Sequence, residues 1–124
     1  VAAAERIRQP FNVNAVAQAA ACAALDDKAF VCKSVALVTQ EKAFIEKALT
    51  ELGIWFKKSA ANFIFMRTEM DARTLFRELL KKGVIIREMS QYNLDNYSRI
   101  TIGTRRENMK LIRALKDIIK EDLK

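Results

Sequence analysis

Residues 98–104 read Ser-Arg-Ile-Thr-Ile-Gly-Thr, and the side chains along this stretch alternate between polar and apolar. A period of two is typical of a β-strand, with Ile100 and Ile102 on one face and Arg99 on the other. An arginine in the middle of a short strand is partly removed from water, where an unpaired charge is costly. Arg99 therefore needs an anion, and its planar guanidinium fits a carboxylate or a phosphate in a two-pronged manner.

A second arginine, Arg87, follows the apolar run 84–86 and is separated from Arg99 by a polar stretch. We expect two neighbouring strands to bring Arg87 and Arg99 to one edge of a sheet. Two guanidinium groups at one edge would suit a doubly anionic ligand, such as one with a phosphate and a carboxylate. The alternative, which spacing alone slightly favours, is that each arginine pairs with a carboxylate of the chain, for which Glu88 and Asp95 are the candidates.

From residue 53 onward, strand patterns alternate with helix patterns. The expected order is strand, strand, helix, strand, strand and helix, at residues 54–56, 63–66, 71–83, 84–86, 97–102 and 104 onward. Asp71 is the expected N-cap of the first of these helices, and Thr104 with Glu107 forms a capping box for the second. The stripes expected to face the core are Ala72, Leu75, Phe76, Leu79 and Leu80, and then Leu111, Ile112, Leu115, Ile118 and Ile119.

Two helices precede this region. Asn12 or Asn14 offers an N-cap for an alanine-dominated helix over 15–25, whose small side chains should allow it to be well buried. Asp26 and Asp27 end that helix and begin a long one that runs to about Leu52. The expected fold is α/β of the α+β type: a small mixed sheet of about four strands, with helices packed on it and a long helix before it.

The predicted domain organisation is a single domain over 1–124, with a helical part at 1–50 and a sheet part at 53–124. We expect the helical part to contact a larger domain that this chain lacks. Without that domain an apolar face would be exposed, which predicts self-association. Because the chain begins with Val1 in the middle of a helical pattern, we also expect it to be a fragment of a longer protein.

Composition is that of a folded soluble protein, with 51% hydrophobic and 30% charged residues and a net charge of +7. No run is apolar over the length that a membrane span needs. Cys22 and Cys32 lack metal-ligand spacing and the chain has no histidine, so no metal site is expected. Two cysteines in helical patterns fit a reduced, cytoplasmic setting.

Four segments carry a resemblance to a known family. They read Arg-Gln-Pro-Phe-Asn-Val-Asn at 8–14, Ser-Ala-Ala-Asn-Phe at 59–63, Gly-Val-Ile-Ile-Arg at 83–87, and Ser-Arg-Ile-Thr-Ile-Gly-Thr-Arg-Arg-Glu-Asn at 98–108. In this order and spacing they resemble the C-terminal part of the histidinol-phosphate aminotransferases, which are pyridoxal-phosphate enzymes of histidine biosynthesis. The resemblance covers essentially the whole chain and implies the C-terminal small domain of a fold-type I pyridoxal-phosphate enzyme.

This resemblance assigns roles to individual residues. Arg99 matches the family arginine that binds the α-carboxylate of the amino donor, glutamate. Arg87 matches an arginine on the side of the phosphate-bearing substrate. Asn12 and Asn62 match positions near the junction with the large domain, where a supporting role is implied.

The resemblance also implies what lies elsewhere. The lysine that forms a Schiff base with pyridoxal phosphate lies upstream in the family, as do the residues that hold the cofactor phosphate and ring. We therefore expect no catalytic, cofactor-binding or metal-binding residue in this chain, and no transamination by the chain alone. The implied partners are amino-acid and oxo-acid substrates, the large domain of the same polypeptide and a second subunit in a cytoplasmic homodimer, with no nucleic acid and no membrane.

Two alternatives remain at this stage. A related aminotransferase for aromatic amino acids, or a phospho-amino-acid decarboxylase, would share the scaffold, and the loop 90–96 matches the family pattern least well. A different class is a regulatory or nucleic-acid-binding α/β module, which the order of elements and the positive charge would suit. Against that class, the expected strands lack a paired-aromatic platform for stacking bases. Tight binding with a steep salt dependence would favour it.

Overall fold

The computed structural model of the chain describes residues 13–122, and the predicted site residue Asn12 lies outside them. The chain divides into two compact units, Val1–Ser34 and Val35–Lys124, each of which is considered by itself. Helix α2 (Ala15–Asp26) belongs to the first unit. The second unit contains most of helix α3 (Lys28–Glu51) and all of the sheet.

The predicted boundaries of α2 and α3 are confirmed by their caps. The side chain of Asn14 accepts a hydrogen bond of 2.8 Å from the Ala17 N–H, and that of Asp27 accepts one of 2.9 Å from the Phe30 N–H. The expected burial of the alanine-rich helix is wrong for this chain, because α2 has no buried residue. Small side chains allow a helix to pack closely, but burial also requires a neighbouring element to pack against.

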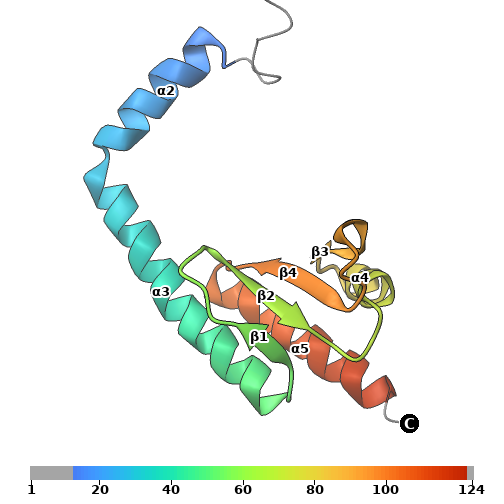
Figure 1. Cartoon of the computed structure of the whole chain (residues 1–124). Coiled ribbons are helices and arrows are strands. Elements are labelled where there is room, and N and C mark those ends of the chain that lie inside the picture. The colour runs from blue at the N-terminus through green and yellow to red at the C-terminus, as the bar shows by residue number, and fades with distance from the viewer. Residues whose placement is uncertain (1–12, 123–124) are drawn as a thin grey trace, which may run out of the picture. The chain divides into compact units, whose positions relative to one another are not determined.

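The second unit is built on a four-stranded sheet with the order β1-β2-β4-β3 (Figure 1). The strands are β1 (Trp55–Lys57), β2 (Phe63–Arg67), β3 (Arg87–Glu88) and β4 (Tyr97–Thr101). All three neighbouring pairs are antiparallel. The fold class is therefore confirmed, while the expectation of mixed strand directions is corrected to an antiparallel sheet.

The apolar run 84–86 is not the strand that its composition suggested. Residue 84 instead closes the end of helix α4 (Ala72–Lys81), where the Val84 N–H donates to the Leu79 carbonyl over 2.9 Å. Gly83 precedes it with a φ of +71°, a left-handed conformation that glycine adopts readily at the end of a helix. Strand β3 begins only at Arg87, the first residue that pairs with β4.

The core of this unit lies between one face of the sheet and the helices α3, α4 and α5 (Arg105–Asp122) (Figure 1). Its side chains come from the alternating positions of β2 and β4 and from the helices, and include Ile45, Leu49, Ile64, Met66, Leu75, Leu79, Ile100 and Leu115. The predicted stripes are largely confirmed, but Leu80 is 47% exposed. The alternation in β4 is confirmed too, since Ser98 and Ile100 are buried while Arg99 lies on the opposite face.

Candidate functional site

Arg87 and Arg99 lie directly opposite each other on neighbouring antiparallel strands. Arg87 of β3 pairs in register with Arg99 of β4. Residues in such a pair point to the same face of the sheet, so both side chains lie on the face that turns away from the core. The structure thus brings together the two arginines that the sequence predicts as neighbours.

Both arginines line one cavity of about 700 Å³ at the β3 side of the sheet. Its lining is Arg73, Phe76, Arg77, Ile85, Ile86, Arg87, Glu88, Gln91, Arg99 and Thr101. Four arginines and a single glutamate give this cavity a strongly positive potential, which raises the local concentration of anions. Asn62 is not among the lining residues, and its carbonyl accepts a hydrogen bond of 3.0 Å from the Ile102 N–H instead.

Arg99 is half-buried and rests on an aromatic ring. Its guanidinium carbon lies 5.0 Å from the centre of the Phe63 ring, within the range of a cation–π interaction. Among residues 13–122, neither Arg99 nor Arg87 makes an ion pair. Ring contact leaves the edge of the guanidinium, with its N–H donors, available for a planar anion.

The carboxylate expected as an internal partner is engaged elsewhere. The Glu88 side chain accepts hydrogen bonds from the Ser90 hydroxyl and from the Ser90 N–H, the latter over 2.8 Å. Ser90 in turn accepts a 2.8 Å bond from Nε of Arg73 on α4. The other candidate, Asp95, makes no ion pair with the arginines within the described part, so the alternative of internal pairing is wrong for both acids.

These hydrogen bonds predict a pH dependence of stability. Donation from the Ser90 hydroxyl and N–H holds the pKa of Glu88 below its ordinary value of 4.5. A carboxyl with a lower pKa in the folded state than in the unfolded state stabilises the fold above its unfolded pKa. That contribution is lost as the pH falls below about 4.5 and through the lower pKa of the folded state.

The measurement compares the unfolding free energy of the chain with that of Ser90→Ala between pH 7 and pH 3. We expect the variant to be less stable at neutral pH and the difference to shrink with acidification. Asp71 and Glu107, whose pKa values are also lowered by capping hydrogen bonds, are present in both proteins and cancel. A difference that stays constant down to pH 3 would show that the Ser90 bonds do not depend on the Glu88 charge.

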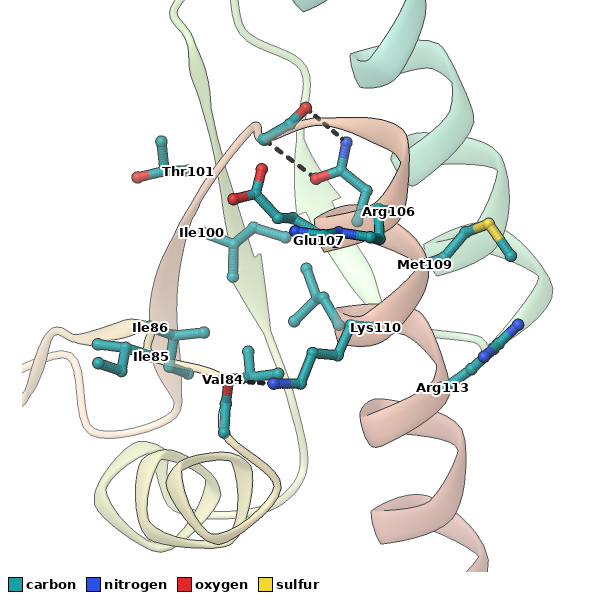
Figure 2. Close-up of a pocket in the computed structure, with 14 residues that line it drawn as sticks. Val84, Ile85, Ile86, Ile100, Thr101, Arg106, Glu107, Met109, Lys110 and Arg113 are labelled. Carbon is teal, nitrogen blue, oxygen red and sulfur yellow. Dashed lines mark hydrogen bonds between the residues drawn. The ribbon is translucent and has the colours of Figure 1, made fainter.

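A larger cavity of about 920 Å³ lies between the chain that follows α4 and the first turns of α5 (Figure 2). Two of its four charged groups, Glu107 and Lys110, serve the fold. Glu107 accepts from the N–H and hydroxyl of Thr104, which is the carboxylate half of the predicted capping box, and Lys110 donates to the Gly83 carbonyl over 2.8 Å. The other two, Arg106 and Arg113, are exposed on α5, whereas Arg87 and Arg99 are direct cross-strand partners, so the smaller cavity with the arginine pair is the better candidate for a ligand.

Two groups of residues near the site were not predicted from the sequence. Arg73 and Arg77 of α4 line the arginine cavity, and their spacing of four residues on one helical face was the available signal. The other group is aromatic. Tyr97 stacks on Phe65 with ring centres 5.1 Å apart and meets Trp55 edge-on at 6.2 Å, on the same face of the sheet as Arg99.

This aromatic cluster corrects the argument against a nucleic-acid module, since the sheet does carry neighbouring aromatic rings. The signal was the alternation in β2, where Phe63 and Phe65 share a face. The rings do not by themselves indicate a function, because aromatic pairs also stabilise a sheet directly.

In the part of the chain that the structure describes, no three His, Cys, Asp or Glu side chains gather in a way that could hold a metal ion. Cys22 and Cys32 are free and exposed. None of the described helices combines the length and apolarity that crossing a membrane requires.

Comparison with known proteins identifies the scaffold. Residues 1–115 match the family Aminotransferase class I and II. The chain is 46% identical over 114 residues to a histidinol-phosphate aminotransferase of Moorella thermoacetica, covering 92% of this chain and 30% of that protein. It is 43% identical over 122 residues to histidinol-phosphate aminotransferase 1 of Psychrobacter arcticus, covering 94% of this chain and 32% of the relative.

A solved structure agrees with these relatives. The histidinol-phosphate aminotransferase of Clostridium acetobutylicum superposes with a TM-score of 0.79 at 27% identity, covering 97% of this chain and 37% of that chain. The chain therefore spans about a third of the length of the proteins it matches. Since the family match extends over more than nine-tenths of the sequence, this chain belongs to the class I and II aminotransferases.

Proposed function

We propose that this chain is the C-terminal, substrate-binding domain of a histidinol-phosphate aminotransferase. The whole enzyme would convert L-histidinol phosphate and 2-oxoglutarate to imidazole acetol phosphate and L-glutamate. The observation that carries this proposal is the cross-strand pair of Arg87 and Arg99, which share one cavity and have no carboxylate partner among the described residues. The similarity to histidinol-phosphate aminotransferases supports a substrate that bears both an amino group and a phosphate.

The two arginines are assigned different tasks. Arg99, half-buried and held against Phe63, binds the α-carboxylate of glutamate with its planar fork. Arg87, exposed on the edge strand β3, contacts the phosphate of the other substrate. For Asn62 we propose a supporting role near the junction with the large domain, and Asn12, outside the described residues, shares that assignment.

The domain assignment follows the same reasoning. We propose that residues 1–124 form one domain of a longer polypeptide. Its helical part, 1–50, would contact the large domain, and its sheet part, 53–124, would carry the substrate arginines. The exposed apolar side chains of α2, Val16 and Leu25, are suited to that contact because they are 80% and 77% exposed in this chain.

The family is pyridoxal-phosphate-dependent, and the cofactor supplies the stabilisation of the carbanion formed at the substrate α-carbon. The residues that line the cavity of Arg87 and Arg99 do not fit it. No lysine lines the cavity that holds Arg87 and Arg99, so the Schiff base that anchors the cofactor has no nucleophile there. We infer that the cofactor is held by the large domain and that this chain contributes substrate binding alone.

This inference predicts that the isolated chain does not take up the cofactor. Mixed with pyridoxal phosphate, it should give no stable absorbance band, and borohydride reduction should label no single lysine. The full-length protein under the same conditions is the control and should be labelled on one lysine. Stoichiometric labelling of one lysine in the isolated chain would contradict the assignment of the cofactor to the large domain.

An assay of the full-length protein tests the function itself. With 2-oxoglutarate as acceptor, L-histidinol phosphate should yield glutamate with a higher kcat/KM than phenylalanine or tyrosine. The aromatic cluster of Trp55, Phe65 and Tyr97 beside Arg99 favours the second candidate, an aminotransferase for aromatic amino acids. A preference for phenylalanine or tyrosine would replace the first proposal with the second, and decarboxylation of a phospho-amino acid would replace both.

The remaining assignments follow from the proposed reaction. The partners would be small amino acids and oxo acids, the large domain of the same polypeptide and a second subunit in a homodimer. The setting would be the cytoplasm, with no nucleic acid or membrane as a partner.

A further inference from the structure

A buried carboxylate on α3 joins two parts of the chain that lie more than sixty residues apart in sequence. Glu41 is only 5% exposed, yet both oxygens of its carboxylate accept hydrogen bonds. One accepts a 2.9 Å hydrogen bond from Nε of Arg105, and the other accepts a 2.8 Å bond from the side-chain amide of Asn108. Arg105 also stacks over Phe44, with its guanidinium carbon 3.9 Å from the ring centre.

Asn108 also bonds to Gly103, which follows the end of strand β4, and so links Glu41 to that strand. Asn108 is 2% exposed, and its side-chain amide makes two hydrogen bonds with the backbone of Gly103. The amide nitrogen donates to the Gly103 carbonyl over 2.9 Å, and the amide oxygen accepts from the Gly103 N–H over 3.0 Å. We call Glu41, Arg105, Asn108 and Gly103 the carboxylate clamp.

Besides the bond from Lys42 to the Ser59 carbonyl in the β1–β2 connection, the clamp supplies directional hydrogen bonds that join α3 to the end of β4. The hydrogen bonds of β4 to its neighbours fix Arg99 within the sheet, but they do not fix the sheet relative to α3. The apolar contacts of Ile45 and Leu49 hold α3 against the sheet. Because hydrophobic contact is not directional, these contacts do not define one exact position of α3 along the sheet. Buried, fully paired hydrogen bonds are directional and tie a packing arrangement to one geometry.

Resting on the proposed function, we propose that Glu41 is a positioning residue for Arg99. Through Asn108 and Gly103, it sets where the strand that carries the carboxylate-binding arginine lies relative to α3. Glu41 does not contact the substrate. Its loss would therefore weaken binding of the amino donor, glutamate, because Arg99 lies four residues before Gly103 and would be misplaced.

The decisive variant is Glu41→Gln in the full-length protein. It keeps the shape but turns one acceptor into an N–H group that faces either Arg105 or Asn108, both of which are donors. The matched control is Glu78→Gln, which makes the same change in an exposed ion pair with Lys81 on α4. Arg105→Gln, at a residue whose side chain is 45% exposed, is a milder variant that keeps the Asn108 bond and serves if Glu41→Gln does not fold.

Two measurements are made on each variant. We expect Glu41→Gln to raise the KM for glutamate about ten-fold, a change equivalent to about 1.4 kcal/mol of binding, with kcat less affected. We also expect the Gly103 amide to exchange its hydrogen faster, and Arg105→Gln to show both effects more weakly. Glu78→Gln should show neither.

The outcomes separate the two proposals. A purely structural role would lower thermal stability and the active fraction while leaving KM unchanged, and that result would overturn the role of Glu41 in positioning. Unchanged exchange at Gly103 would overturn it as well. If Arg99→Lys itself left glutamate turnover intact, the proposed function would fail first, whatever the behaviour of Glu41.

Discussion

Replacing Arg99 with lysine should lower kcat/KM for glutamate in the full-length protein by roughly 30- to 900-fold. The loss corresponds to about 2–4 kcal/mol, since a buried carboxylate left without its two-pronged partner forfeits charge-assisted hydrogen bonds and retains its desolvation cost. Lysine keeps the charge but presents a single point donor, and it lacks the planar guanidinium whose central carbon lies 5.0 Å from the centre of the Phe63 ring.

The control for this variant is Arg67→Lys. Arg67 lies on the same face of the sheet in β2, opposite Tyr97 rather than in the arginine cavity. Steady-state kinetics with varied glutamate should therefore change little for Arg67→Lys. Equal losses for the two variants would mean that positive charge on this face matters and that a carboxylate-specific fork does not.

The parts of the fold that the sequence predicted well are those set by local chemistry. Asn14, Asp27 and Asp71 begin helices where their side chains accept from backbone N–H groups, and glycines end α3 and α4 in left-handed conformations. The alternation around Arg99 also held, because the period of two assigns each side chain of β4 to a face once one face is buried. The neighbouring position of Arg87 followed from the short connection between the two strands.

The errors arose where a residue depends on a partner distant in sequence. The run 84–86 is apolar enough for a strand, but ladder pairing with β4 begins only at Arg87. Glu88 is next to Arg87 in sequence and was therefore a reasonable partner for it. Its carboxylate instead accepts hydrogen bonds from the hydroxyl and N–H of Ser90, two residues away. Composition also could not show that Glu41 is buried, since the donors that satisfy it lie more than sixty residues further along the chain.

Replacing Arg87 with alanine should affect the two substrates unequally. In the full-length protein we expect kcat/KM for L-histidinol phosphate to fall roughly 10- to 150-fold, the effect of losing about 1.5–3 kcal/mol of hydrogen bonding to a charged group. Glutamate turnover should change much less, because the α-carboxylate is assigned to Arg99. Arg113→Ala, which removes an exposed arginine from the wall of the other cavity, is the matched control.

The geometry sharpens this expectation. Arg87 and Arg99 are direct cross-strand partners, and two like charges placed opposite each other on antiparallel strands repel. The phosphate of L-histidinol phosphate, with a charge of about −1.5 to −2 at pH 7, offsets that repulsion when it contacts Arg87. By the proposed division of roles, glutamate places its α-carboxylate at Arg99 and leaves Arg87 without a partner. Removing Arg87 should therefore leave the KM for glutamate unchanged or slightly lower. Parallel losses on both substrates would instead show that the arginines act as one undivided anion site.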